Sequence, residues 1–241
     1  MDVRIIYEDQ EIIVVIKPAG MPSQSDRGMT MDMVSYLKNY LVPSVSGEPY
    51  IGVIHRLDRP VGGVMVYAKT PQAAKILSGQ LQKKQIGKKY MAVLTGKLPN
   101  EEGTLKDWIE TDKRTNVSKI VSKPSKAAKE AALNYRVIGT AEHEGQVYSL
   151  TDIELITGRH HQIRVQTAGA GAGIYGDTKY NPAFQGKKGW FDLGLFSYYL
   201  AFKHPKTGRP LTFKEKPSGG AFEWFKDGSL ELQEAEEIYG Y

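Results

Sequence analysis

The stretch Gly52–Thr70, GVIHRLDRPVGGVMVYAKT, joins a charged loop to an apolar run and organises the rest of the chain. Its first half places a histidine, an arginine, an aspartate and a second arginine within residues 55–59. Pro60 and two glycines then bend the backbone before the β-branched run 64–68, which is typical of a buried strand. Asp58 is therefore predicted on a constrained loop at a strand's edge, where two flanking guanidinium groups favour its ionised form. The alternative is a surface turn stabilised by Arg–Asp pairs.

The composition narrows the class of protein. With 241 residues the chain is long enough to bury a sizeable core. Its net charge of +5 suggests a phosphate-bearing partner. Cysteine is absent, which excludes disulfides, thiolate metal ligands and cysteine nucleophiles. The N-terminal residues lack the pattern of a signal peptide, and no apolar run approaches the roughly 20 residues of a spanning helix. We therefore expect a cytoplasmic protein that makes no use of a membrane.

Hydrophobic patterning predicts a chain rich in strands. Residues 3–7 and 12–16 read as an opening hairpin, and the second strand is apolar throughout, as expected of a strand covered on both faces. That strand ends at Lys17, a candidate wall of the site. Apolar and polar residues alternate over 147–155, which indicates a sheet with one covered face. The other expected strands are 90–94, 103–111, 116–122, 131–138, 195–202 and 210–213.

Helices are expected between these strands. Thr30 is the predicted N-cap of the first, with Asp32 in its first turn. The second begins at Thr70-Pro71, where a capping residue precedes a proline, and Gly87 is predicted to close it. An acidic helix is expected over residues 229–238, on the outside. No internal repeat or low-complexity linker divides the chain, so we expect one continuous unit.

A second polar cluster occupies residues 158–168, GRHHQIRVQTA. If Gly158 caps a helix, His160, His161 and Arg164 share one face through neighbours three and four apart. Two histidines suggest zinc, but adjacent histidines point apart on a helix, and neither a third ligand nor the metalloprotease spacing accompanies them. We therefore expect no metal. Histidines and an arginine at a helix start favour phosphate binding, or positioning of the chain around a site.

Taken together and in this order, the two clusters resemble the RluA-type pseudouridine synthases. The resemblance implies an α+β pseudouridine synthase fold, a mixed, mostly antiparallel sheet with flanking helices around a basic cleft. We also expect a single catalytic domain over residues 1–241, without the separate N-terminal RNA-binding domain that many relatives carry, because the hairpin starts at once. The matching stretches are Lys17–Gly20, His55–Asp58, Lys88–Tyr90 with Ala92 and Gly96, Gly158–Val165, Gly176–Asp177 with Tyr180, and His204–Pro205.

The same resemblance implies a function. The expected activity is isomerisation of a specific uridine in structured RNA, ribosomal or transfer, to pseudouridine. The resemblance implies no cofactor and no metal, and we expect a monomer. Asp58 is then the essential aspartate and the nucleophile, Arg164 the arginine that pairs with it, and Tyr90 the family's tyrosine. Arg56 falls where relatives place an arginine in the space left by the flipped base.

The chemistry fits these residue types. Exchanging a glycosidic N–C bond for a C–C bond needs a group that can attack and later leave, as an ionised carboxylate can. Attack on the uracil ring and attack on the ribose carbon both remain open. The uridine must leave its stack at a cost of roughly a few kcal/mol, which a tyrosine face and an inserted arginine would partly offset. The remaining substrate-binding candidates are His55, Lys17, Arg159, His161 and Gln162.

The chain departs from the family pattern in two places. Relatives usually carry Thr-Ser-Gly after the aspartate loop, where this chain has Val61-Gly62-Gly63. His160 stands where a small or polar residue is usual. Losing two hydroxyls alters how the loop is held or how it meets RNA. The aspartate is intact, so we expect activity.

Two other functions compete with this interpretation. His161-x-x-Arg164 matches the short signature of tyrosine-type DNA strand transferases, in which Tyr175 or Tyr180 would attack phosphorus. The strand-rich pattern argues against that mostly helical class. A non-catalytic RNA-binding module that kept the scaffold is the third possibility.

Overall fold

One sheet organises the molecule. The computed structural model describes residues 3–24, 31–44, 47–189 and 191–225. Its strands run in the order β1-β2-β4-β10-β5-β9-β8-β6-β7, with β3 beside β4 and β11 beside β10. Among the described pairs, β4 and β10 are parallel and the rest antiparallel. The mixed, mostly antiparallel α+β sheet that was expected is thereby confirmed.

The element bounds follow the predicted runs closely. The strands are β1 (Arg4–Glu8), β2 (Ile12–Lys17), β3 (Gly52–Val53), β4 (Gly62–Ala68), β5 (Gly87–Thr95), β6 (Glu102–Asp112), β7 (Val117–Val121), β8 (Ala128–His143), β9 (Gln146–Leu155), β10 (Leu195–Lys203) and β11 (Pro210–Lys214). The helices are α1 (Met33–Leu41), α2 (Pro71–Gln82) and α3 (Gln162–Gly169), with short 3-10 turns η1 (Val42–Ser44) and η2 (Gly220–Trp224).

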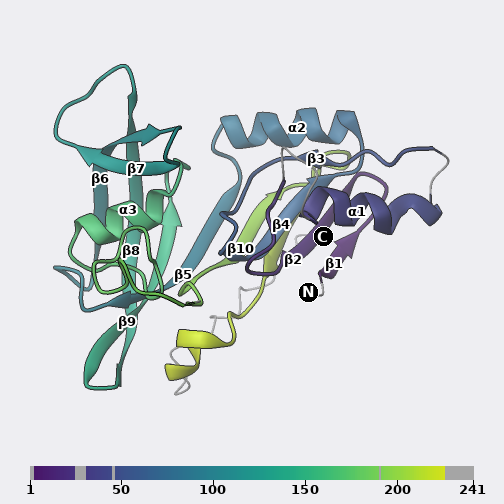
Figure 1. Cartoon of the computed structure of the whole chain (residues 1–241). Helices are drawn as coiled ribbons and strands as arrows, with labels where there is room; N and C mark the ends of the chain where they lie inside the picture. The colour runs from purple at the N-terminus through teal and green to yellow at the C-terminus, as the bar shows by residue number, and fades with distance from the viewer. Residues whose placement is uncertain (1–2, 25–30, 45–46, 190, 226–241) are drawn as a thin grey trace.

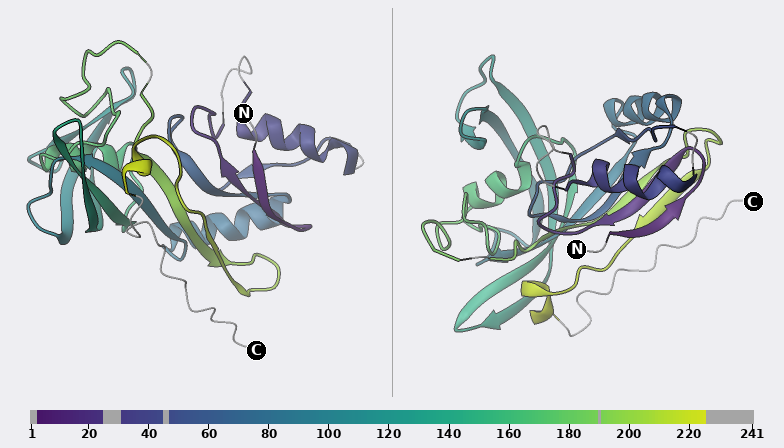
Figure 2. Two further views of the ribbon diagram at one scale, coloured as in Figure 1. Left: turned by 90° about the horizontal axis from the view of Figure 1, so that it is seen from below. Right: turned by 45° about the vertical axis from the view of Figure 1, so that its right-hand side comes forward.

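Helices α1 and α2 cover opposite faces of the sheet (Figure 2). Strand β2 shows why, because successive side chains of a strand point to opposite faces. Ile13 and Val15 pack in the cluster that contains α1, whereas Ile12 and Val14 pack in the cluster that contains α2. Burying each such side chain contributes about 1.5–3 kcal/mol. The continuous apolar run therefore predicted a strand covered on both faces correctly.

The two polar clusters of the sequence lie in different halves of the sheet. Figure 1 shows β6 to β9 with α3 in one half, and β1, β2 and β4 with α1 and α2 in the other. Strands β5 and β10 run between the halves. The loop that carries Asp58 joins β3 to β4, and α3 follows β9. Any contact between the clusters must therefore cross the middle of the molecule.

The first helix begins later than predicted. Helix α1 starts at Met33, and its N-cap is Asp32, whose side chain accepts a hydrogen bond from Ser35 N at 2.8 Å. A carboxylate at this position also interacts favourably with the helix dipole. Thr30, the predicted N-cap, and the expected acidic helix over 229–238 both lie outside the described residues.

The second helix starts as predicted and ends earlier. Thr70 is its N-cap and Pro71 its first residue. It ends at Gln82, because Lys84 adopts a left-handed φ of 56° that a helix cannot continue. Gly87, the predicted helix end, is instead the first residue of β5.

Gly63 fixes how β4 leaves the Asp58 loop. Its φ is +131°, a conformation that residues with a side chain rarely adopt. A Cβ added there would lie 2.2 Å from the carbonyl oxygen of Ser197 on β10. This close approach accompanies the parallel pairing of the two strands, in which Gly63 stands opposite Ser197. Glycine is therefore required at this position on both steric and conformational grounds.

Replacing this glycine should destabilise the fold. We expect Gly63→Ala to lower the free energy of unfolding by about 2 kcal/mol or more, from backbone strain and overlap with β10. The matched control is Gly79→Ala on α2, where a Cβ meets nothing within 4 Å. That change should raise the free energy by about 0.5–1 kcal/mol, because alanine favours helix. Urea denaturation measures both, and a Gly63→Ala protein as stable as wild type would contradict the close approach.

Candidate active site

Asp58 and Arg164 are in contact although 106 positions separate them. Arg164 Nη1 donates to Asp58 Oδ2 at 3.2 Å. The Asp58 side chain is 27% exposed and that of Arg164 is 6% exposed, so a solvent-accessible carboxylate rests on a buried cation. The arginines next to Asp58 in sequence lie elsewhere: Arg59 Nε donates to the Gly20 carbonyl, and Arg56 is exposed. The cation that contacts Asp58 thus comes from the second cluster.

A second carboxylate, Asp177, fixes Arg164 from the other side. Arg164 Nε and Nη2 donate to its two carboxylate oxygens at 2.8 and 2.7 Å, in the bidentate geometry that suits a guanidinium. Asp177 Oδ1 also accepts from the backbone N–H groups of Lys179 and Tyr180. Burial opposes the charge on Arg164, but Asp177 and Asp58 together raise its pKa above the usual value. Arg164 is therefore a fixed, oriented positive charge.

The chain enters α3 differently from the prediction. The helix begins at Gln162, and its N-cap is His161, whose left-handed φ of 53° separates the preceding residues from the helix. Gly158 is not the cap, and the predicted common helical face of both histidines and the arginine is wrong for this reason. His161 Nδ1 lies 2.6 Å from the Tyr180 hydroxyl, and its Nε2 lies 3.5 Å from Asp58 Oδ2.

Both histidines of the second cluster are neutral near pH 7. Burial lowers the pKa of His161 to about 4; the charge of Asp58 opposes this shift and that of Arg164 adds to it. Burial also lowers the pKa of His160. The two rings lie 3.7 Å apart between centroids, and His160 Nδ1 is 3.0 Å from Ser118 Oγ.

Tyr90 is buried on β5, on the face of the sheet that carries Ile163 of α3. Burial raises the pKa of its hydroxyl, the charge of Asp58 raises it further, and a hydrogen bond with Ser197 opposes them. Tyr90 is therefore protonated at neutral pH, and the charge of Asp58 disfavours its ionised form.

Lys17 ties the Asp58 loop to the end of β2. Its side chain is fully buried, and Nζ donates to the carbonyls of Met21, Pro18 and Arg59 at 2.7, 2.9 and 3.3 Å. Burial lowers the pKa of Lys17 to about 7, and the charge of Asp58 opposes this shift. The ammonium group thus finds its acceptors inside the protein.

His55 and Gln162 are likewise buried with partners in the protein. His55 Nε2 accepts from Val66 N at 3.4 Å, and burial lowers its pKa to about 3, with the charge of Lys88 adding to the shift. Gln162 donates to the Ala132 carbonyl at 3.0 Å and accepts from the Thr157 hydroxyl at 2.7 Å. These contacts hold the Asp58 loop and the first turn of α3, which carries Arg164.

Two further binding candidates reach solvent. Arg56 is exposed, two positions from Asp58. Arg159 is partly exposed, and its Nε donates to the Glu130 carbonyl at 2.8 Å. Lys88, half-buried on β5, brings Nζ near Gly158, where an added Cβ would meet it at 3.6 Å. These cations lie on the segments that lead to the Asp58–Arg164 pair.

Sequence reasoning gave no role to Asp177 or Ser118, and considered Tyr180 only as a phosphorus nucleophile. Asp177 belongs to the matched pair Gly176–Asp177, so a carboxylate in a buried turn was the available signal. Ser118 lies in the middle of β7 and carried no signal at all. Such roles depend on contacts between strands, which spacing along the chain does not reveal.

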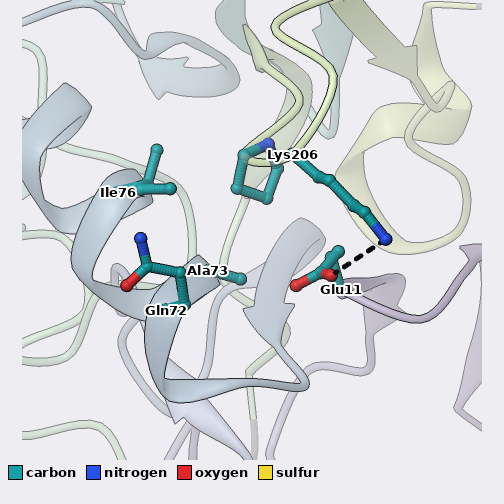
Figure 3. A pocket seen from close by; sticks show the side chains of 6 residues that line it. Glu11, Gln72, Ala73, Ile76 and Lys206 are labelled. Carbon is teal, nitrogen blue, oxygen red and sulfur yellow. Dashed lines mark ion pairs between the residues drawn. The ribbon is translucent and has the colours of Figure 1, made fainter.

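A cavity of about 380 Å³ is lined by none of the candidate site residues (Figure 3). Residues of α2 and of the β10–β11 turn line it, together with Glu11, which pairs with Lys206 at 3.8 Å. Among the described residues, no group of three or more His, Asp or Glu side chains is arranged to hold a metal ion. The described helices are too short or too polar to cross a membrane.

Comparison with known proteins identifies the family. Residues 11–169 match the model of the family described as RNA pseudouridylate synthase. The chain belongs to this family. It is 31% identical over 229 residues to tRNA pseudouridine synthase C of Haemophilus ducreyi, covering 88% of this chain and 90% of that protein. It is 30% identical over 251 residues to ribosomal large subunit pseudouridine synthase D of Pseudomonas aeruginosa, covering 100% of this chain and 75% of that protein.

A solved structure shares the fold. Human RNA pseudouridylate synthase domain containing 1 superposes with a TM-score of 0.74 at 21% identity, covering 90% of this chain and 84% of that one. The protein is thus an RNA pseudouridine synthase, and the resemblance drawn from its two clusters is confirmed. The strand transferase is set aside, as is the non-catalytic module.

Removing the charge of Asp177 should be costly because it leaves a buried guanidinium with half its partners. We expect Asp177→Asn to lower the free energy of unfolding by about 3–5 kcal/mol in urea denaturation. The control is Asp112→Asn, at an exposed turn where the carboxylate accepts from Arg114 N at 2.8 Å. That change should stay within about 0.5 kcal/mol. Equal effects of the two substitutions would contradict the proposed importance of the buried pair.

Stability should also fall in mild acid. His55 and His161 titrate near pH 3 and 4 when folded, whereas an unfolded histidine titrates near about 6.5. Below about pH 6.5 these histidines become protonated in the unfolded chain but stay neutral in the folded chain. The free energy of unfolding therefore drops by up to about 1.4 kcal/mol per pH unit for each histidine. Urea titrations between about pH 7 and pH 5 should show this slope, and His55→Gln should flatten it. An unchanged slope in His55→Gln would exclude a buried neutral histidine.

Proposed function

We propose that the protein isomerises a specific uridine of structured RNA, with Asp58 as the nucleophile that acts on a flipped nucleotide. The observation that carries this proposal is the Asp58–Arg164–Asp177 arrangement. A carboxylate that is 27% exposed is held at 3.2 Å by an arginine, and a buried carboxylate clamps that arginine in turn. Arg164 orients Asp58 without covering it.

The reaction exchanges one bond to the ribose for another. The bond between uracil N1 and ribose C1′ breaks, a bond between C5 and C1′ forms, C5 loses its proton, and N1 takes up a proton, so the product is an isomer. An ionised Asp58 can add to the uracil ring or to C1′ and leave again once the base has turned. Both routes need the same carboxylate at the same place. The proposal is therefore independent of which atom is attacked.

Tyr90 and Arg56 are proposed to receive the extruded nucleotide. The Tyr90 hydroxyl stays protonated and its pKa responds to the charge of Asp58, which suits a ring face against the uracil and a hydroxyl near the ring carbon that loses its proton. Arg56 is exposed two positions away, where it can fill the gap left in the RNA stack. Together they would offset part of the roughly few kcal/mol that base extrusion costs.

The RNA backbone is proposed to lie along basic residues that reach the surface. Partly exposed Arg159 is beside the entry to α3, and half-buried Lys88 is near Gly158. Such contacts give affinity that falls as salt rises. The names of the two relatives point to transfer RNA and large-subunit ribosomal RNA, and we propose one of these classes as the substrate. The exposed lysines that extend this surface are Lys83, Lys84, Lys123 and Lys126.

The decisive experiment measures release of tritium from RNA labelled at uridine C5. Asp58→Asn should lower the rate by at least about 10³-fold while RNA binding, followed by filter retention, changes little. Asp152→Asn serves as the control, because its carboxylate accepts from Tyr198 on another part of the sheet and should leave the rate unchanged. A fully active Asp58→Asn protein would remove Asp58 from the mechanism. RNA binding by the wild type without tritium release from any candidate RNA would remove the activity itself.

A further inference from the structure

The Tyr180 hydroxyl contacts one ring nitrogen of His161, and the Asp58 carboxylate lies near the other. The hydroxyl accepts a hydrogen bond from the backbone N–H of Ser118 at 2.8 Å and lies 2.6 Å from His161 Nδ1. Burial raises the pKa of Tyr180, so the hydroxyl keeps a proton to donate. Nε2 lies 3.5 Å from Asp58 Oδ2, and an ionised carboxylate can only accept. The tautomer that gives both nitrogens a complementary partner has Nδ1 as the acceptor and the hydrogen on Nε2.

The Nε2 side of the ring lies near the carboxylate of Asp58. His161 Nε2 is 3.5 Å from Asp58 Oδ2, the same oxygen that Arg164 Nη1 contacts at 3.2 Å. Among the described residues, both contacts of this carboxylate go to Oδ2. Oδ1 therefore stays available to another molecule.

The surroundings keep the His161 ring neutral and in place. Burial lowers the pKa of His161, and the charges of Arg164, His160 and Lys179 lower it further. The charge of Asp58 raises it. The balance places the pKa at about 4. The His160 ring lies against that of His161, and Ser118 Oγ donates to the His160 carbonyl at 2.8 Å. Ser118 thus orients Tyr180 through its backbone and His160 through its side chain.

We propose that His161 is a positioning residue that donates from Nε2 to Asp58 Oδ2, that Tyr180 selects this tautomer, and that Asp58 Oδ1 is the attacking oxygen. This inference rests on the proposed function and assigns His161 a role other than contact with RNA. A neutral donor orients the carboxylate and leaves its charge unpaired on that side. A protonated His161 would form a second ion pair and reduce the nucleophilicity of Asp58.

The tautomer of His161 can be measured by NMR without an assay of enzyme activity. Long-range ¹H–¹⁵N NMR of the whole protein labelled at histidine should show His161 as the Nε2–H form near neutral pH. In Tyr180→Phe the donor to Nδ1 is lost, so the spectrum should move toward a mixture of tautomers and the His161 pKa should rise by about one unit. A wild-type Nδ1–H form, or a charged ring at neutral pH, would overturn the inference even if Asp58 is the nucleophile.

Kinetics then test the consequence for Asp58. Tyr180→Phe should lower kcat about 10-fold with little change in KM, and move the acid limb of the kcat–pH profile upward by about one unit. His161→Gln places an amide donor near the position of Nε2 and should keep most of kcat, whereas His161→Leu should lose at least about 10-fold. The control Tyr198→Phe removes a hydroxyl that donates to Asp152 at 2.9 Å and should leave kcat and its pH profile unchanged.

The outcomes separate this inference from the proposed function. Equal kcat for His161→Gln and His161→Leu, with both folded by circular dichroism, would refute the positioning role. A parallel rise of KM in both would indicate contact with RNA instead. Full activity of Asp58→Asn would refute the proposed function, whatever tautomer the NMR spectrum shows.

Discussion

Arg164 is the single side chain on which the arrangement of the site depends. It belongs to the half of the sheet that carries α3, and it contacts a carboxylate from the other half while a carboxylate of its own half clamps it. A buried guanidinium with one partner fewer would be a strongly unfavourable charge in the interior. The two halves are already joined through the β10–β5 and β5–β9 pairings, and Arg164 adds a side-chain contact between them at Asp58. A substitution of Arg164 would therefore affect both the stability of the fold and the position of Asp58.

Around this pair, buried polar groups serve mainly to hold backbone. Lys17 satisfies its ammonium on three carbonyl oxygens, one of them from the residue after Asp58. Ser23 exchanges hydrogen bonds with both backbone groups of Leu57, the residue before Asp58. Fully satisfied polar networks of this kind rigidify a loop, because any rearrangement leaves a buried group unpaired. The partly exposed carboxylate of Asp58 thus projects from a loop whose backbone is held by the buried side chains of Lys17 and Ser23.

Much of this could be predicted from the residues, and the remainder had identifiable causes. The strands followed from alternation and β-branched runs, and the aspartate loop from its Pro and Gly residues, because both signals are local. Helix ends were less predictable: Asp32 competed with Thr30 as a cap, and Lys84 took a left-handed conformation that nothing in its own identity demands. The role of Ser118 had no signal in the sequence, and Asp177 had only its place in the matched pair Gly176–Asp177, since both roles arise where β7, α3 and the following turn meet. Contacts between distant segments carry no periodic signature.

The parallel pairing of β4 with β10 has a consequence for biosynthesis. Strand β10, residues 195–203, is inserted between β4 and β5, which are formed by residues 62–68 and 87–95. The amino-terminal strands therefore cannot join the rest of the sheet until residue 203 has emerged from the ribosome. Contacts between such distant segments form slowly, because a long loop must close before any pairing offsets its entropy. A nascent chain that stops before residue 195 would hold Asp58 on a partial sheet that lacks the strand between β4 and β5.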